Sequence, residues 1–478
     1  MVVKKTLNAK NLEALGAERL AELLIEISAG DAAAKRRLRL ELAGAQSPAE
    51  AAREIRKRLS AIARSRTFVD WQNRRALVDD LETQRRAIVE QVAKADVTEA
   101  LDLMWGFLAL ANSIFERCDD SSGTVIGIFH SAANELGELA KAANADSKAL
   151  ADRTFQALIE NNYGQFDYLI SALRPALGEE GLEHLKQRMI ALSKEPVKKL
   201  PEEERRKIGW SSGGSIYEDD IANRHRASVI HLALKEIADA QGDVDSFIAQ
   251  YDSQTRKVPR IAAHIARRLL AAGRTEEALQ TIEATEHTRS GWLDFEWEDA
   301  RIDVLDALGR SDDAQAVRWS CFERSLSPTH LRAYLKRLPD FDDIEAEYRA
   351  LDYAEKYKGL LQALSFLASW LALDRAANLV INRSEELHGD HYEILTPAAN
   401  ALAGKHPLAA TLLLRAMIDF SLDQGRSSRY RHASRHLMDC ASLALSIPDF
   451  GKFETHEAFV ARLRAQHGKK SSFWSLVS

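Results

Sequence analysis

The amino-acid sequence predicts an all-α protein in which an N-terminal helical domain precedes a right-handed α-solenoid of helical hairpins. Apolar residues make up 46 % of the 478 residues, and in most segments they recur at the spacing of an amphipathic helix. Glycine and proline, the residues that helices tolerate least, number only 23 and 10. The sequence has no run of alternating valine, isoleucine and threonine that would indicate a strand.

The N-terminal helices follow one another with short breaks. The first is marked by an apolar stripe of Leu12, Leu15, Leu20, Leu23, Leu24 and Ile27. Gly30 suits the C-terminus of that helix, and Asp31 suits the N-cap of the next. The same periodicity, with a break near 161–164 in the last segment, predicts helices over residues 35–43, 48–65, 71–93, 97–117, 125–143 and 148–170.

A linker or long loop is predicted over residues 194–222. The stretch "KEPVKKLPEEERRKIGWSSGGSIYEDD" combines two prolines, a cluster of charges and a serine–glycine run. It would separate an N-terminal helical domain, residues 1–193, from C-terminal helical repeats, residues 223–478. The alternative is a loop between two helices that pack against each other.

The C-terminal part contains a recurring pattern in which a glycine is followed by an alanine five residues later. "AGRTEEALQTIEA" (272–284) and "LGRSDDAQAVRWS" (308–320) show it most clearly. The pairs are Gly273 and Ala278, Gly309 and Ala314, and Gly404 and Ala409, with Gly242 and Phe247 at the same offset and a less regular unit at 371–383. The first three glycines are 31 and 36 residues apart, a spacing typical of helix–turn–helix repeats.

The physical basis of this pattern is simple. Glycine permits the left-handed backbone of the turn between two helices. The small alanine lets the second helix lie close to the first. Because a single hairpin cannot bury its apolar face, neighbouring hairpins are expected to stack.

Residues 223–478 therefore resemble degenerate tetratricopeptide repeats. The tryptophan and tyrosine positions of the first helix of that family are mostly missing here. The resemblance implies a TPR-like α-solenoid.

A second resemblance covers most of the chain. The stretches "LGAERLAELLIEISAGDAAAKRRLRLELAG", "IRKRLSAIARSRTFVDW", "YGQFDYLISALRPALGEEGLEHLKQRMIAL" and "HGKKSSFWSLV" are similar to an uncharacterised bacterial family, a domain of unknown function. The resemblance implies an all-α fold and brings no activity and no functional residues. Some related proteins carry a SWIM-type zinc finger ahead of similar helical segments. That motif needs C-x-C followed by C-x-H, which this sequence lacks, so no zinc is implied.

Two stretches of the N-terminal half echo each other. "LGAERLAEL" (15–23) and "LGEEGLEHL" (177–185) both read L-G-x-x-x-L-x-x-L. Either both begin an equivalent pair of helices, or the match is a coincidence in a leucine-rich chain.

Composition predicts a cytoplasmic protein that does not associate with membranes. The net charge of −6 does not indicate nucleic-acid binding by the whole chain. Cys118, Cys321 and Cys440 are too far apart and too few for a disulfide framework, as expected in a reducing compartment. The N-terminus lacks the apolar segment of a secretory signal, and stretches such as "LMWGFLALA" (103–111) are too short to span a bilayer.

The sequence contains no motif that predicts an enzyme or a bound cofactor. There is no G-x-S-x-G, and no G-x-G-x-x-G follows a strand. One set of residues resembles a metal site: His432, His436 and Cys440 recur every four residues and share a helix face. They extend over about 12 Å of helix, however, too far to converge on one ion. We therefore expect a polar stripe and no metal.

The C-terminal "HGKKSSFWSLV" (467–477) has two readings. Lys469, Lys470, Phe473 and Trp474 could form a docking peptide. Alternatively, the aromatic residues anchor a cap on the last helices, because the terminal units of a repeat array need atypical caps.

Residues 35–90 are locally basic, with 14 lysines and arginines against 8 acidic residues. The candidate phosphate contacts on this face are Arg53, Arg56, Lys57, Arg64, Arg66, Arg75 and Arg86. Against this, Asp79 and Glu82 lie four residues from Arg75 and Arg86 and would neutralise them. Phe68 and Trp71 are expected to be packed and therefore not available for stacking on bases.

These observations favour a non-catalytic interaction or scaffold protein. Its helical-repeat surface would bind a protein or peptide partner. The alternative is an accessory protein that binds nucleic acid or phosphate through the basic N-terminal face.

Overall fold

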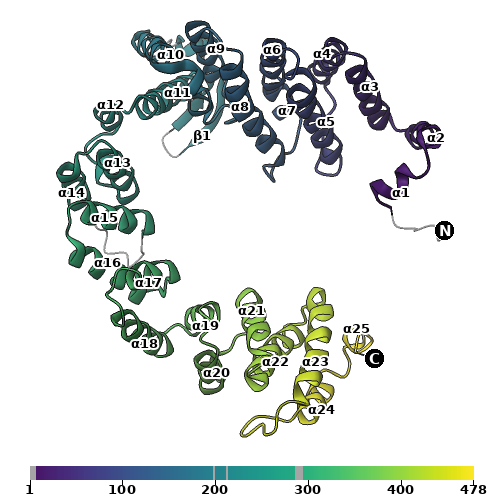
Figure 1. Cartoon of the computed structure of the whole chain (residues 1–478), viewed down its shortest axis with the longest axis vertical. Coiled ribbons are helices and arrows are strands. Elements are labelled where there is room, and N and C mark those ends of the chain that lie inside the picture. Colours follow the sequence, from purple (N-terminus) through teal and green to yellow (C-terminus); the bar gives the residue numbers. More distant parts are fainter. Residues whose placement is uncertain (1–6, 197–199, 212–213, 286–293, 478) are drawn as a thin grey trace. The chain divides into compact units, whose positions relative to one another are not determined.

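The computed structural model describes residues 7–196, 200–211, 214–285 and 294–477 (Figure 1). The all-α prediction is confirmed, since the regular elements in these ranges are helices apart from one short hairpin. The chain forms two compact units, Met1–Asp252 and Ser253–Ser478, and each is described by itself.

The first unit contains twelve labelled α-helices and two strands within the described residues. They are α1 (Ala9–Glu13), α2 (Ala17–Ser28), α3 (Ala32–Gln46), α4 (Pro48–Arg64), α5 (Arg74–Ala87), α6 (Val97–Leu108), α7 (Ala111–Phe115), α8 (Thr124–Ala142), α9 (Ser147–Ile159), α10 (Leu169–Lys194), β1 (Lys207–Ser211), β2 (Gly214–Tyr217), α11 (Glu218–Gln241) and α12 (Val244–Ala249).

Most predicted helices of this unit are present, with three differences. The first predicted helix, marked by the stripe from Leu12 to Ile27, is divided into α1 and α2 around Gly16, and most of that stripe is exposed. Helix α5 begins at Arg74 and passes into a π-helical turn, Ile88–Val92. The helix predicted over 97–117 is divided into α6 and α7. The break predicted near 161–164 is confirmed, because α9 ends at Ile159 and α10 begins only at Leu169.

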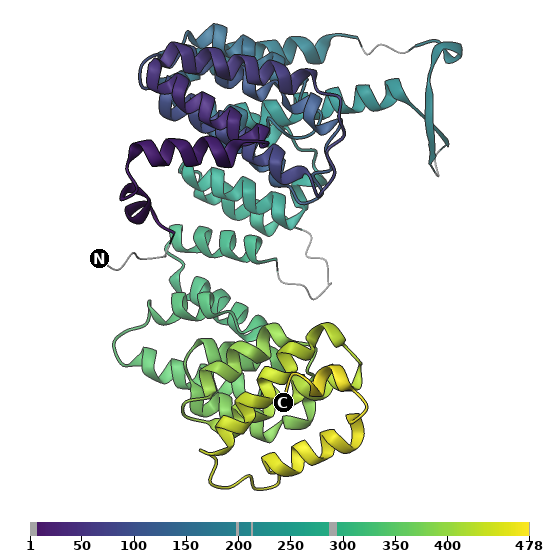
Figure 2. The ribbon, with the colours of Figure 1, turned by 90° about the vertical axis from the view of Figure 1, so that its right-hand side faces the viewer.

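The stretch predicted as a linker lies inside the first unit. Strands β1 and β2 pair antiparallel there, with Trp210 opposite Ser215, although no strand was predicted. Helices α10 and α11 on either side pack against each other, because Ala233 and Ile237 of α11 join the core of this unit. The units therefore divide after Asp252, outside residues 194–222. Figure 2 shows the hairpin at the far end of α10 and α11.

The echo between the two L-G-x-x-x-L-x-x-L stretches has a structural counterpart. Gly16 and Gly178 both have positive φ, 81° and 57°, and a helical segment follows each. The geometry favours an equivalent turn over coincidence. The surroundings differ, however, since Leu177 is buried while its counterpart Leu15 is exposed.

The second unit consists of helices throughout its described part. They are α13 (Pro259–Ala271), α14 (Thr275–Glu283), α15 (Phe295–Ala307), α16 (Ser311–Ser325), α17 (Pro328–Leu335), α18 (Asp342–Glu355), α19 (Leu360–Ser369), α20 (Leu373–Asn382), α21 (Tyr392–Leu402), α22 (Pro407–Asp423), α23 (Tyr430–Ala444), α24 (His456–His467) and α25 (Ser471–Trp474).

The helices of this unit pack mainly against their neighbours in the chain. Helix α13 contacts α14 and α15, and α19 contacts α20 and α21 in the same way. One buried cluster joins α15 and α16 and includes Leu305, Ala314 and Cys321. A larger one extends from Phe322 of α16 to Phe473 of α25. Helix α16 thus contributes to both clusters.

The predicted glycine turn is present at three of the four glycines. Gly242, Gly273 and Gly309 have φ of 71°, 73° and 72°. At Gly309 the turn is closed by the Arg310 N–H, which donates to the Leu305 carbonyl at 2.9 Å. The alanines Ala278 and Ala314 are fully buried, as the close approach of two helices requires.

The remaining two units of the pattern differ from this rule. Gly404 is not left-handed, although Ala409 behind it is buried. At 371–383 Leu371 takes the left-handed position with φ of 63°, and Ala376 is buried five residues later. Glycine is therefore favoured by this turn without being required.

The difference between Gly309 and Gly404 makes a matched test. We expect Gly309→Val to destabilise the second unit by about 2 kcal/mol, because a β-branched residue is strained in the left-handed region. Gly404→Val should have a much smaller effect, because Gly404 does not have positive φ. Available space does not distinguish the two positions, since no atom lies within 4 Å of an added Cβ at either of them. Urea unfolding followed by circular dichroism measures both, and equal midpoints would contradict the assignment. Gly213, a natural comparison in the predicted linker, lies outside the described residues.

Within the described residues, no helix combines the length and the apolar character needed to cross a bilayer.

Candidate functional site

The basic residues singled out on the N-terminal face are all exposed, but most have acidic partners. Arg53 pairs with Glu50 at 3.0 Å, Arg56 with Glu99 at 2.6 Å, Lys57 with Glu54 at 3.6 Å, and Arg86 with Glu82 at 3.4 Å. Arg64 donates to a carbonyl of its own helix at 3.1 Å. No ion pair engages Arg66 or Arg75 in the described part of the chain. The pairing predicted between Glu82 and Arg86 is present, whereas the one between Arg75 and Asp79 is not.

The expectation that Phe68 and Trp71 are packed is wrong. Their side chains are 66 % and 67 % exposed, on the loop between α4 and α5. Two hydrogen bonds to Arg117 fix the backbone of this loop. The Val69 N–H donates to the Arg117 carbonyl at 2.8 Å, and Nη1 of Arg117 donates to the Thr67 carbonyl at 3.1 Å. A backbone fixed in this way leaves the two rings pointing outward instead of collapsing onto the helices.

The residues of the predicted stripe, His432, His436 and Cys440, differ in their surroundings. His432 is exposed, His436 lies 3.9 Å from Asp439, and Cys440 is buried. Burial raises the pKa of the Cys440 thiol to about 12, which disfavours the thiolate that would bind zinc. Among the described residues, no three potential ligands come together.

The C-terminal stretch acts as a cap on the last helices. Phe473 is buried in the larger core cluster, where its ring contacts that of Tyr430. Lys470 Nζ donates to the Leu422 carbonyl at 2.6 Å, and Trp474 Nε1 donates to the His467 carbonyl at 2.9 Å. These contacts favour the anchor over the docking peptide.

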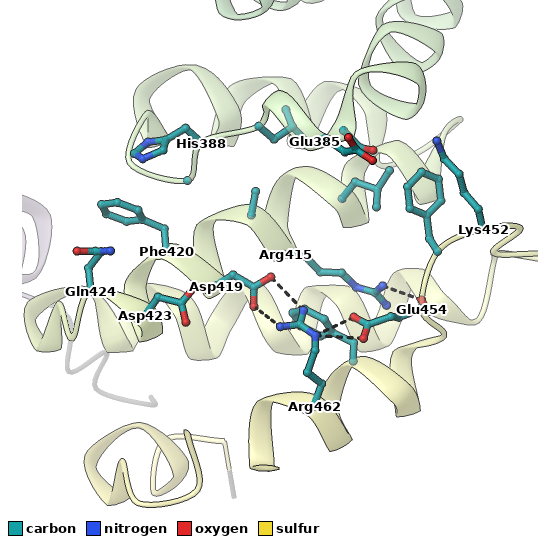
Figure 3. A pocket seen from close by; sticks show the side chains of 17 residues that line it. Glu385, His388, Arg415, Asp419, Phe420, Asp423, Gln424, Lys452, Glu454 and Arg462 are labelled. Atoms are coloured by element: carbon teal, nitrogen blue, oxygen red, sulfur yellow. Dashed lines mark hydrogen bonds and ion pairs between the residues drawn. The ribbon is translucent and has the colours of Figure 1, made fainter. Parts of the chain in front are cut away.

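A cavity of about 630 Å³ lies in the second unit, at a place that sequence reasoning did not identify. Figure 3 shows it between helix α22 on one side and the segment with Glu385 and His388 on the other. Lys452 and Glu454, from the connection between α23 and α24, close one end, and Arg462 of α24 completes the wall.

The wall near His388 is set by a close backbone contact. A Cβ added to Gly389 would lie 2.0 Å from the Ala416 carbonyl oxygen of α22, so only glycine fits there. The His388 ring rests against Phe420, with centroids 5.0 Å apart. The connection from α20 to α21 is therefore held directly against α22.

The floor of the cavity is a charged network centred on Arg462. Its guanidinium lies 3.1 Å from Asp419 and 3.0 Å from Glu454, so one cation holds two carboxylates. Burial raises the pKa of Asp419, and the ion pair with Arg462 opposes this shift. One turn further along, at the C-terminal residue of α22, Asp423 lies 3.0 Å from Nε2 of His467.

Arg415 is the most unusual member of this site. Its side chain is only 5 % exposed, and Nη1 donates to the Glu454 carbonyl at 2.7 Å. Nε and Nη2 have no hydrogen-bond partner. The guanidinium lies 4.5 Å from the ring centroid of Phe459, and burial lowers its pKa.

One sequence signal could have revealed this site. Arg415 lies within "LLLRAMI" (412–418), an otherwise apolar helical run. A single arginine there has to enter the core or a cavity. The partners Asp419 and Arg462 are 43 residues apart, and only the fold brings them together.

A buried carboxyl in the first unit should make stability depend on pH. Glu236 lines a small apolar pocket with Leu158 and Phe166, and this burial raises the pKa of its carboxyl to about 7. Lys235 opposes the rise, whereas Asp167 and Asp239 add to it. Since the folded pKa exceeds the unfolded value, folding stability should fall as pH rises from about 4.5 to about 7.

We therefore expect Glu236→Gln to stabilise the protein at pH 8 and to change little at pH 5. Glutamine keeps the shape and never carries the buried charge. Urea midpoints at the two pH values measure the effect. Glu138→Gln, at an exposed position of α8, is the control and should show no such pH dependence. A Glu236→Gln effect that is equal at both pH values would contradict the prediction.

Comparison with known proteins adds one finding. A family model described as "Family of unknown function (DUF6880)" matches residues 2–476. Comparison with curated proteins and with solved structures gave no match.

Proposed function

We propose that this chain, which belongs to the DUF6880 family, is a non-catalytic interaction protein that binds a protein or peptide partner through its helical surface. In this proposal the second unit is a TPR-like, right-handed α-solenoid. The resemblance to helical regions that accompany SWIM-type zinc fingers stays a prediction, and the proposed function does not depend on it. The observation that carries the proposal is the series of helix pairs that pack in chain order through a recurring turn.

An exposed apolar stripe on α18 supports partner binding. Ile344 and Tyr348 are spaced i and i+4, so they share one face of α18, and Phe341 is the residue just before the helix. All three side chains are exposed. A contiguous group of large apolar side chains in water is typical of a surface that another molecule covers.

The test is an affinity purification from the native source with the full chain as bait, read by mass spectrometry. We expect a partner that the wild-type protein retains and that Ile344→Ser with Tyr348→Ser loses. Leu445→Ser, at an exposed apolar position just after α23, is the control and should retain the partner. Identical partner sets for all three proteins would remove the support that the stripe gives.

The second candidate is binding of single-stranded nucleic acid by the first unit. The exposed rings of Phe68 and Trp71 favour it, because aromatic side chains beside arginines such as Arg66 can stack on bases. The acidic partners of Arg53, Arg56 and Lys57 weigh against it.

A salt titration of full-length protein with labelled oligonucleotides separates the two candidates. Phosphate contacts should make affinity fall with salt, each adding about 0.7 to the log–log slope on a single strand. Phe68→Ala with Trp71→Ala should weaken binding, as should Arg53→Glu with Lys57→Glu. Absence of binding at low salt would leave only the protein-binding candidate.

A further inference from the structure

The cavity of the second unit contains a buried cation that lacks a carboxylate of its own. Arg415 donates to a backbone carbonyl and lies over the Phe459 ring, and two of its nitrogens have no hydrogen-bond partner. A guanidinium removed from water without an ionic partner is costly, and a ligand that supplies a carboxylate would offset that cost. The arrangement is thus typical of a site that is complete only when occupied.

Three of the four acidic residues that line the cavity already contact other basic residues. Asp419 and Glu454 both contact Arg462, and Asp423 contacts His467. Lys452 and Glu385 remain at the rim, where no ion pair engages either residue in the described part of the chain. Arg415 and Lys452 are therefore the two cations of the cavity that no carboxylate contacts in the described part of the chain.

The remaining walls are apolar and aromatic. Leu412 and Phe459 lie near Arg415, and Phe420 and Phe453 line the cavity as well. A volume of about 630 Å³ is ample for one or two amino-acid side chains together with their backbone. The ligand that fits combines one negative charge with an apolar group.

We propose that this cavity binds a peptide segment through a carboxylate, which Arg415 and Lys452 receive while an apolar side chain packs against Phe420 and Phe453. The proposal rests on the proposed function and names its ligand. The carboxylate comes from an aspartate or glutamate side chain or from a peptide C-terminus. Because the unpartnered nitrogens are buried in the structure, binding requires the Arg415 side chain to turn from the Glu454 carbonyl toward the ligand.

A carboxylate fits this site better than a phosphate group. Four carboxylates line the same cavity, so a doubly charged group is repelled more strongly than a singly charged carboxylate. A planar carboxylate also matches the paired N–H groups of a guanidinium.

The experiment uses the full chain and four pools of fluorescein-labelled random hexapeptides. One central position is fixed as glutamate or as glutamine, and each pool is made with a free or an amidated C-terminus. Fluorescence polarisation should give an affinity at least about tenfold higher for a carboxylate-bearing pool than for the amidated glutamine pool. The pool that gains identifies which carboxylate is used. Equal affinities for all four pools would overturn the proposal.

Substitutions assign the preference to the cavity. Arg415→Met should abolish it, and Lys452→Gln should reduce it by about threefold, as expected for a rim charge. Arg435→Gln, at an exposed position of α23 outside the cavity, should leave it unchanged. If Arg415→Met fails to fold, the exposed Lys452 decides, and a preference that survives Lys452→Gln unchanged overturns the proposal.

The result is distinguishable from failure of the proposed function. A partner that depends on the α18 stripe, together with equal binding of all four pools, would overturn the carboxylate site alone. A carboxylate preference removed by Arg415→Met, with no partner retained in the purification, would support the site and count against the α18 surface.

Discussion

Replacement of Gly137 by alanine is expected to destabilise the first unit by about 3 kcal/mol, one of the largest effects of any single methyl group in this chain. Gly137 lies on α8 where this helix crosses α10. An added Cβ would lie 2.2 Å from the Ala172 carbonyl oxygen and 2.8 Å from its carbon. Both are backbone atoms, so the two helices would have to separate to relieve the contact.

The same helix supplies a control with the opposite sign. Gly127 also lies within α8, but no atom is within 4 Å of an added Cβ. Gly127→Ala should therefore stabilise the helix by about 0.5–1 kcal/mol, because alanine has less backbone freedom to lose on folding. Urea unfolding gives both values, and hydrogen exchange of peptides from α8 and α10 locates them. Two variants with shifts of the same sign would show that α8 and α10 do not approach this closely.

Asp306→Ala is expected to cost about 3 kcal/mol in the second unit, because it leaves a buried arginine without its main partner. Arg318 of α16 is only 2 % exposed, and it forms an ion pair with Asp306 of α15 and donates a hydrogen bond to Gln315 Oε1 at 3.0 Å. Arg337 approaches Asp306 from the exposed side, at 3.4 Å.

Two further variants separate the buried charge from the exposed one. Arg337→Ala should change stability by less than about 1 kcal/mol, since a partly exposed pair contributes little. Combining Asp306→Ala with Arg318→Met should recover most of the loss, because both buried charges are then absent. If the double variant is as unstable as the sum of its single changes, packing and not charge explains the effect. Thermal or urea unfolding of the wild-type protein, the single variants Asp306→Ala, Arg318→Met and Arg337→Ala, and the double variant completes the cycle.

Most of the helices could be predicted because the apolar spacing that indicates a helix lies entirely within the helix itself. The helix predicted over 48–65 and the break predicted near 161–164 depend on local features, and both predictions are confirmed. The hairpin β1–β2 was missed because "KIGWS" and "GSIY" are short and lack the apolar alternation of a half-buried strand. The boundary after Asp252 was missed because it depends on α11 packing against α10, a contact between distant segments.

The candidate site was beyond local reasoning for a related reason. Phe68 and Trp71 look like core residues in sequence, and only the hydrogen bonds that fix their loop explain why they are exposed. The cavity draws on α22, α24 and two connections, so its ligand-facing residues are scattered over about 80 positions from Ser384 to Arg462. Leu371 is the opposite case. The unit predicted at 371–383 has the left-handed turn, although leucine rarely adopts positive φ.

The position of α16 has a consequence for how disturbances travel along the second unit. Ala314 and Cys321 belong to the cluster shared with α15, and Phe322 belongs to the cluster that reaches the C-terminal helices. Where each segment contacts mainly its sequence neighbours, cooperativity is transmitted from one to the next and is limited by the weakest junction. Helix α16 is the junction between these two clusters, because it contributes to both. Loosening it would allow α13 to α15 to unfold at a lower denaturant concentration than α19 to α25, and a single melting transition would become two.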